Sequence, residues 1–342
     1  MRNLLKTFAI LLFLYFSENL FSFQFPILTE VCEYLTDSSL VTEYQIENFQ
    51  DGVEIEINIF KKETKEIIKI NRQKIIGDFG KITEKENYKF EIPLHLLPND
   101  FSFTKYIIFP KIIFENRIYY EMKKVKKGKY LVQKNRDEVV SESTKGFYIS
   151  KFEVSNEQFA AFINSDGYEI EEYWLIKEGT MQNREVGWNF QGKFMMSSPF
   201  GWNLSEIPYW KSAASNFIFG PVTNLRWFEA NAFCNWMGFA LPNLTDISIC
   251  FSFDSVENDS LYNPVCIEND ENENHPLHFV KSNVSEWIIL SAESNIPACG
   301  PGCREMFYIK NNFQTDYNFP DIGLSCPLYR NEILGFRYIL RD

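Results

Sequence analysis

The sequence predicts two parts with different folds: a small β-sandwich, followed by an α+β domain with little regular secondary structure. The length of 342 residues favours two domains over one. Apolar and polar residues alternate from Val53 to Ile59, as they do in a half-buried strand. From about Lys123 onward, strand patterns give way to short helix patterns, long polar loops and tryptophans. We therefore place the sandwich at residues 23–122 and the α+β domain at residues 123–342.

The first 22 residues predict a secretory signal peptide. Arg2 and Lys6 give a basic start, and residues 8–16 form an unbroken apolar run that is too short to span a bilayer comfortably. An uncleaved N-terminal anchor is the alternative interpretation. The rest of the chain has no segment long enough to span a membrane. We therefore expect no transmembrane span beyond the signal peptide, and a secreted, periplasmic or cell-envelope protein.

Short strand patterns continue through residues 23–122. Residues 65–70 look like a partner for the strand at 53–59, and the glycines of Gly77-Asp78-Phe79-Gly80 predict a turn. Further strands are expected at 106–109 and 112–120, with Pro110 between them marking a sheet edge or a break. Several short strands between turns suggest an immunoglobulin-like sandwich. Nothing in this segment indicates catalysis, which favours a plain structural module over an adhesion or spacer role.

Two helices are expected after Lys123. Ser155 and Gln158 have the spacing of a capping box, in which each side chain binds a backbone amide at the helix start. We expect Gly167 to end this helix, and its apolar face to comprise Phe159, Phe162 and Ile163. The second helix lies in PVTNLRWFEANAFCNWMGFALP (221–242) and should end at Gly238. Its apolar face should comprise Ala230, Phe233, Cys234 and Met237.

Charge and cysteine usage narrow the function classes. The net charge of −12 argues against nucleic-acid binding, which needs a basic surface. One short basic patch is explained more simply by a solvated strand end than by a phosphate site, and it comprises Lys123, Lys124, Lys126, Lys127 and Lys129. Seven cysteines are an odd number for an exported protein, so at least one cannot pair within the chain. Their spacing fits no zinc site, and a buried thiol is the simplest interpretation of Cys234.

Four segments in this order resemble the formylglycine-generating enzyme, or sulfatase-modifying factor, family. They are GFYISKFEVSNEQFAAFIN (146–164), PVTNLRWFEANAFCNWMGFALP (221–242), SNVSEWI (282–288) and LGFRYILRD (334–342). GKYLV (128–132) looks like the strand that opens the family's domain and places the domain start near Lys123. The resemblance implies a C-type-lectin-like α+β fold. It also implies that the aromatic residues of 221–242 belong to the core.

The resemblance implies copper chemistry at two cysteines. Active members of the family hold copper(I) between the cysteines of a G-G-S-[WFY]-x-C-x-x-x-x-C segment. They use dioxygen to oxidise a sulfatase cysteine to formylglycine. The nearest pair here is Cys299 and Cys303, whose C-x-x-x-C spacing is one residue short, and the G-G-S-W core is missing. We expect this pair to be disulfide-bonded, to each other or to other cysteines, and copper to bind only if the protein is catalytic.

The segment around Glu286 resembles the family's calcium-binding D-M-x-G-N-V-W-E-W. A calcium site here would use the Glu286 carboxylate and the carbonyls of Ser282 and Val284. The leading ligand falls at Phe279, which has no side-chain oxygen, and calcium usually takes six to eight oxygens. Glu286 as an ordinary hydrogen-bond acceptor is the alternative.

These observations leave two functions. The first is an exported, non-catalytic binding or scaffolding protein for cell-envelope assembly or ligand binding, with a protein or glycan partner. The second is a divergent formylglycine-generating oxidase that uses copper and dioxygen. The loops would present ligands. Aromatic faces there could stack on sugars or peptides, or could be core, and the tryptophans concerned are Trp174, Trp188, Trp202 and Trp210.

Overall fold

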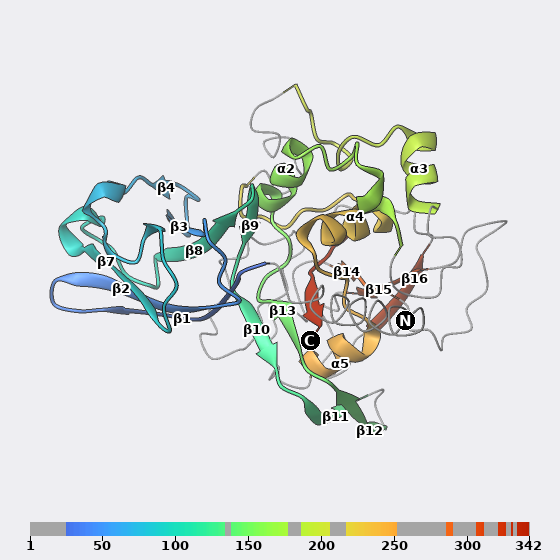
Figure 1. Cartoon of the computed structure of the whole chain (residues 1–342), viewed down its shortest axis with the longest axis horizontal. Coiled ribbons are helices and arrows are strands. Elements are labelled where there is room, and N and C mark those ends of the chain that lie inside the picture. Colours follow the sequence, from blue (N-terminus) through green and yellow to red (C-terminus); the bar gives the residue numbers. More distant parts are fainter. Residues whose placement is uncertain are drawn as a thin grey trace, which may run out of the picture.

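Two antiparallel sheets make up the N-terminal part of the chain (Figure 1). The computed structural model describes residues 25–133, 138–176, 186–205, 217–251, 285–289, 306–310, 321–325, 330 and 334–341. The first sheet has the order β1 (Ile27–Leu35), β2 (Ser39–Glu47), β7 (Tyr88–Pro93), β5 (Ile76–Gly77). The second has the order β4 (Ile67–Ile68), β3 (Glu54–Lys61), β8 (Tyr106–Phe114), β9 (Arg117–Tyr119), and β6 (Gly80–Lys81) also pairs with β3. Short 3-10 turns η1 (Arg72–Lys74) and η2 (Leu94–Leu96) lie in the connections.

The alternation that predicted a strand at residues 53–59 is confirmed in β3. From residue 53, directly before β3, to residue 59, every second residue is buried, and these residues are Val53, Ile55, Ile57 and Ile59. They share one hydrophobic cluster with buried residues of the first sheet, including Leu40, Tyr44 and Phe90, so the two sheets enclose a common core. The predicted partner at 65–70 is confirmed over the two residues of β4. The immunoglobulin-like character of this part stays a prediction.

Pro110 does not break the strand, which corrects one of the two expectations for this residue. β8 runs unbroken from Tyr106 to Phe114 and pairs with β3 along its whole length, with Pro110 opposite Ile57. On its other side β8 pairs with β9 only from Ile112 onward. Among the described strands Pro110 therefore has one neighbour, and its missing N–H costs no ladder hydrogen bond on the side away from β3.

Short strands and helices alternate after β9. β10 (Met122–Val125), β13 (Phe147–Ser150) and β18 (Ile339–Arg341) form one antiparallel sheet, and β11 (Gly128–Gln133) pairs with β12 (Val139–Thr144). A third sheet has the order β16 (Asp321–Ser325), β15 (Met306–Lys310), β14 (Ser285–Trp287), β17 (Leu334–Gly335). The helical elements are α2 (Asn156–Asn164), η3 (Glu171–Trp174), α3 (Val186–Phe194), α4 (Trp227–Met237) and α5 (Leu244–Phe251). The mixed α/β class with many strands and few helices matches the predicted fold class at this level.

The predicted capping box of α2 is confirmed, and its C-terminus differs from the prediction by one residue. The Ser155 hydroxyl accepts from the Gln158 amide, and the Gln158 side chain accepts from the Ser155 amide. At the other end, Asp166 adopts the left-handed conformation (φ 55°) and Gly167 donates to the Phe162 carbonyl at 3.0 Å. Gly167 is the next residue, and a Cβ there would lie 2.2 Å from the Phe162 ring. Close packing therefore explains the glycine better than backbone conformation does.

Helix α4 is buried on nearly all sides, whereas the sequence pattern predicted one buried face. The predicted residues Ala230, Phe233, Cys234 and Met237 are all buried, and so are Trp227, Phe228 and Trp236 from other faces. Gly238 ends the helix with φ 81°, as expected. The Phe233 ring stacks on Phe159 of α2 at 5.5 Å between ring centroids. Cys234 is a buried thiol outside any disulfide, as predicted.

The N-terminal sheets contact the end of α4 directly. The Arg117 Nε of β9 donates to the Trp236 carbonyl at 2.8 Å, and its guanidinium lies 5.3 Å from the Phe25 ring. Phe25 also packs against Gly238, where a Cβ would lie 1.9 Å from the ring. The largest buried cluster contains residues on both sides of Lys123, so the two parts share a hydrophobic core. The domain boundary at Lys123, which lies within β10, stays a prediction. Within the described residues, no helix has the length and apolarity needed to cross a membrane.

Candidate functional site

Glu286 is the predicted site residue that the described part of the chain includes. It lies in the middle of β14, between β15 and β17, and is 4% exposed. The other predicted residues of the calcium and copper sites are outside the described residues, and they are Ser282, Val284, Cys299 and Cys303. The local geometry of the site is therefore built around Glu286.

Arg337 binds the Glu286 carboxylate on both oxygens. Its Nε donates to Oε1 at 3.0 Å and to Oε2 at 2.8 Å, and its Nη2 donates to Oε1 at 2.8 Å. The remaining nitrogen, Nη1, donates to the carbonyls of Ser150 and Lys151 at 3.2 and 3.1 Å. Arg337 comes from the Gly-Phe-Arg segment between β17 and β18 and is fully buried. One side chain therefore joins β14, the end of β13 and the C-terminal segment.

A second carboxylate faces the same guanidinium. The Arg337 Nη2 lies 3.9 Å from Glu153 Oε1, and both side chains are fully buried. Burial by itself lowers the pKa of Arg337, but the negative charges of Glu286 and Glu153 outweigh it and raise this pKa above the ordinary value for arginine. The guanidinium therefore stays charged and has two buried anionic neighbours.

This arrangement fits an ionic structural contact better than a calcium site. Both oxygens of Glu286 already accept charge-assisted hydrogen bonds. A divalent cation on the same carboxylate would lie close to the guanidinium, which repels it. Glu286 thus has the hydrogen-bonding role that the sequence left as the alternative. The calcium site with Ser282 and Val284 stays a prediction.

Two tryptophans connect the N-terminus of α4 to β14 by hydrogen bonds. The Trp287 Nε1 donates to the Leu225 carbonyl at 3.2 Å, and the Trp227 Nε1 donates to the Ile288 carbonyl at 3.1 Å. Both tryptophans are fully buried, so each indole N–H needs such a partner. The aromatic residues of segment 221–242 are core residues, as the family resemblance implied.

The comparisons with known proteins agree with the motifs. Residues 114–254 match the model of the Sulfatase-modifying factor enzyme 1-like domain, which is less than half of the chain. The chain contains a sulfatase-modifying-factor-like domain. The match begins before the boundary that we predicted at Lys123 and includes β9, α2 and α4.

Two solved structures are similar to the chain. The crystal structure of CarF has a TM-score of 0.41 and 15% sequence identity, and the alignment covers 65% of this chain and 98% of CarF. Treponema denticola variable protein 1 has a TM-score of 0.39 and 12% identity, with 69% of this chain and 96% of that protein covered. The search of curated proteins gives no match.

The sulfatase-modifying-factor-like domain also contains a buried glutamate that the sequence analysis missed. Glu229 Oε1 accepts from the Tyr168 hydroxyl at 2.6 Å, and Oε2 accepts from the Arg226 amide at the start of α4 at 2.8 Å. Burial raises the pKa of Glu229, while the hydrogen bonds from Tyr168 and Arg226 oppose the shift. The sequence pattern that could have predicted this contact is the glutamate three residues after the N-cap residue, as in a capping box. It was not recognised because the N-cap residue is an arginine and not a serine or threonine.

The tryptophans of the long polar stretch are mostly core residues. Trp174 is fully buried, Trp202 is 8% exposed, and Trp188 is partly buried against the same cluster. Trp210 lies outside the described residues. Among the described residues of this stretch, Phe200 is 64% exposed and lies 4.9 Å from the Arg330 guanidinium. Phe200 therefore exposes an aromatic ring, whereas Trp174 and Trp202 do not.

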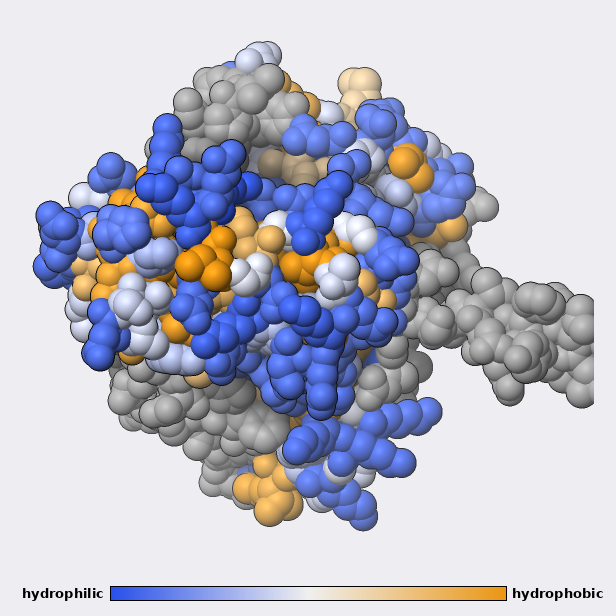
Figure 2. All heavy atoms as spheres, turned by 60° about the vertical axis from the view of Figure 1, so that its left-hand side comes forward, coloured by the Kyte–Doolittle hydropathy of each residue, from blue (hydrophilic) through white to orange (hydrophobic). Residues whose placement is uncertain are grey.

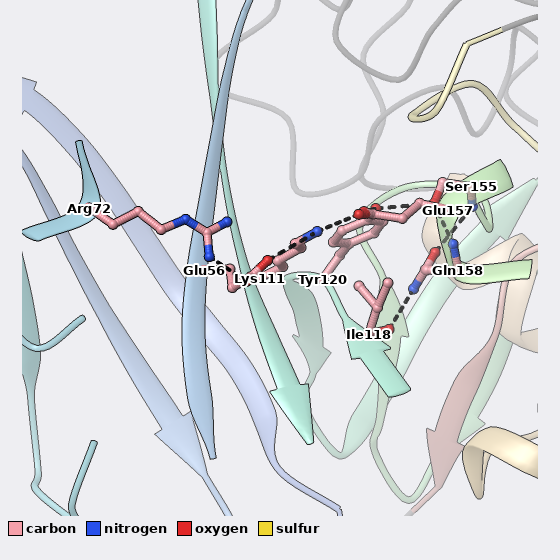
Figure 3. Close-up of polar contacts among 8 residues, drawn as sticks. All are labelled: Glu56, Arg72, Lys111, Ile118, Tyr120, Ser155, Glu157 and Gln158. Carbon is pink, nitrogen blue, oxygen red and sulfur yellow. Dashed lines mark hydrogen bonds and ion pairs between the residues drawn. The ribbon is translucent and has the colours of Figure 1, made fainter. Parts of the chain in front are cut away.

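A chain of polar contacts links the N-terminal sheets to α2 (Figure 3). Arg72 binds Glu56 at 2.7 Å, and Glu56 lies 3.6 Å from the Lys111 ammonium, whose side chain is 4% exposed. Lys111 also pairs with Glu157, on the first turn of α2, where a negative charge interacts favourably with the helix dipole. The contacts run on through Tyr120, which donates to Glu157 at 2.8 Å.

The capping residues of α2 make a second set of polar contacts between this helix and the N-terminal sheets. The Gln158 Nε2 donates to the Ile118 carbonyl of β9 at 3.0 Å, and the Ser155 hydroxyl lies 3.1 Å from that of Tyr120. The capping box thus stabilises α2 and also attaches it to β9. Such a paired and hydrogen-bonded network holds two elements in one orientation, which is a structural role.

Proposed function

We propose that the protein is an exported binding or scaffolding member of the sulfatase-modifying-factor family without oxidase activity. The observation that carries the proposal is the position of Glu286. The acidic residue that survives from the family's metal-binding segment is bound on both oxygens by the buried Arg337. It acts within the core and has no free face toward a ligand. A C-type-lectin-like arrangement of the domain, preceded by an immunoglobulin-like sandwich, agrees with this role.

The cysteine spacing supports the same proposal. Cys299 and Cys303 are separated by Gly-Pro-Gly, one residue fewer than the family's copper-binding pair, and the G-G-S-W core is absent from the sequence. A disulfide needs Cα atoms within about 7 Å, which a tight turn over three residues allows. In an oxidising compartment such a pair forms a disulfide and is lost as a copper(I) ligand pair.

The signal peptide directs the protein to the cell envelope or beyond, where a protein or glycan is the expected partner. Phe200 and Arg330 support a ligand surface on the sulfatase-modifying-factor-like domain, since an exposed ring beside a guanidinium can stack on a sugar or a planar group. The loops of such a domain present ligands without any catalytic group.

Mass spectrometry of a substrate peptide tests the proposal. A peptide with the sulfatase-type cysteine is incubated with the purified protein, copper and oxygen, and its thiol mass is expected to remain unchanged. Counting reduced thiols and titrating copper(I) should show that Cys299 and Cys303 do not bind the metal together. Conversion of the cysteine to the aldehyde, abolished by Cys303→Ser, would overturn the proposal. It would establish the divergent copper-dependent oxidase.

A further inference from the structure

The β11–β12 hairpin is a two-stranded ribbon with one packed face and one open face. Within the described residues, these strands pair only with each other. On the packed face Val132 is buried, and Tyr130 and Val140 contact the cluster that includes α5. The open face carries Leu131 and Val139, which are 73% and 62% exposed. In Figure 1 the hairpin projects from the lower end of the molecule, away from the N-terminal sheets.

The lysines that flank the hairpin give this part of the chain a charge opposite to that of the whole chain. From Lys123 to Lys145 the sequence has eight basic and three acidic residues, whereas the net charge of the chain is −12. Lys123 pairs with Glu121 and Lys124 with Glu47 at the base of the hairpin. The next three lysines are exposed, and they are Lys126, Lys127 and Lys129. In Figure 2 the lower end of the molecule shows hydrophobic side chains next to hydrophilic ones.

We propose that the β11–β12 hairpin docks the protein on an anionic lipid surface. The two exposed aliphatic side chains enter the headgroup region, and the exposed lysines at the base and start of the hairpin bind the lipid phosphates. This combination of a few apolar residues and flanking lysines is the usual composition of a peripheral membrane contact. The proposal does not depend on whether the domain has oxidase activity.

The size of the open face favours a lipid surface over a protein partner. Six-residue strands at about 3.4 Å per residue and about 5 Å apart give a face of roughly 200 Å². A specific protein interface buries about 800 Å² on each partner and needs a complementary shape. A bilayer needs no such shape, because lipids adapt to the inserted side chains. Lysines next to the strands also disfavour the addition of a partner strand at the hairpin edges.

Vesicle binding combined with hydrogen exchange tests this proposal on the full chain. Vesicles of phosphatidylcholine alone are compared with vesicles of equal parts phosphatidylcholine and phosphatidylglycerol. We expect the anionic vesicles, and not the neutral ones, to protect the backbone amides of residues 128–133 and 139–144 from exchange. Because the readout is local, binding through the apolar N-terminal run does not affect it.

Two sets of variants separate the contribution of the lysines from that of the exposed aliphatic side chains. Replacing Lys126, Lys127 and Lys129 with glutamate should weaken binding to anionic vesicles by at least about a hundredfold, because each lysine near such a surface contributes about a fivefold gain and each glutamate adds repulsion. Leu131→Ser with Val139→Ser should weaken it further and abolish the protection of the hairpin. The matched controls are Lys69→Glu, Lys74→Glu and Lys81→Glu, and Ile67→Ser with Ile76→Ser, which change exposed residues of the same types in the N-terminal sheets.

Three results would overturn the proposal. The first is the absence of hairpin protection with anionic vesicles, and the second is an equal loss of binding in the control variants. The third is protection of the same amides by polyglutamate but not by vesicles, which would assign the hairpin to an acidic protein partner. An unchanged thermal midpoint in each variant ensures that the comparison is made between folded proteins.

Discussion

Replacing Arg337 with methionine measures how much the buried ion pair at Glu286 contributes to stability. Methionine keeps a long unbranched side chain but removes the guanidinium that lies 2.8 Å from Glu286 and 3.9 Å from Glu153. The variant also removes the guanidinium N–H groups that donate hydrogen bonds to the carbonyls of Ser150 and Lys151. Removing one partner of a buried ion pair costs about 3–5 kcal/mol. Since a typical domain is stable by about 5–15 kcal/mol, we expect a large fall in the free energy of unfolding.

A double-mutant cycle shows whether this loss comes from the pair. Glu286→Gln keeps the size and one acceptor oxygen and should cost about 1–3 kcal/mol, because the hydrogen bonds lose their charge. The combined variant should be more stable than the sum of the single losses predicts, by about 0.5–3 kcal/mol. Urea unfolding followed by tryptophan fluorescence gives each value, with Trp287 next to the mutated residue. Strictly additive losses would refute the direct interaction.

The same titrations with calcium separate the ion pair from a metal site. Because Arg337 binds both oxygens of Glu286, we expect calcium to leave the urea midpoint of the wild-type protein unchanged. A ligand that binds the folded state alone raises stability in proportion to the logarithm of its concentration. Stabilisation of the wild type by calcium that Glu286→Gln abolishes would show that this carboxylate binds the ion.

Three further predictions concern the packing of α4. Phe233→Ala should lower the free energy of unfolding by about 3–5 kcal/mol through a cavity, measured by urea unfolding, and an unchanged midpoint would mean an exposed face. Gly238→Ala should lower the thermal midpoint more than Gly52→Ala. Both have positive φ, but a Cβ at Gly238 would meet the Phe25 ring while Gly52 has open space, and equal shifts would contradict the contact. Burial raises the pKa of Glu229, so its protonated form favours folding. The stabilisation present below the ordinary carboxyl pKa should be lost as pH rises through the raised value, and Glu229→Gln should remove that dependence, measured by unfolding at several pH values.

Local sequence patterns predicted those structural features that depend on residues only a few positions apart. The alternation at Val53–Ile59, the capping box of Ser155 and the glycine at 238 each depend on residues within a few positions, and all three are found in the structure. The helix end at Gly167 was predicted one residue late, since Asp166 can adopt the left-handed conformation as well. The sequence left open whether Pro110 marks a sheet edge or a strand break. The pairing of β9 decides this, because β9 reaches only from Ile112 to Phe114 of β8 and not to Pro110.

The contacts around the candidate site could not be predicted in this way. Arg337 binds Glu286 from 51 positions away, and Lys111 pairs with Glu157 across 46 positions. No periodicity relates residues so far apart, and only the assembled sheets bring them together. The family resemblance identified Glu286 and the Gly-Phe-Arg segment, but it did not predict that they bind each other.

The motifs that identify the family describe the scaffold of the domain. Trp227, Trp287, Glu286 and Arg337 come from three separate motifs, yet they meet in one buried assembly that joins α4, β14 and the C-terminal segment. Each is fixed by packing and by hydrogen bonds that would be costly to leave unmade. In the sequence, Cys299 and Cys303 belong to a different segment from these motifs. These motif residues are therefore explained by the stability of the domain, and the family resemblance rests on scaffold residues and not on catalytic ones.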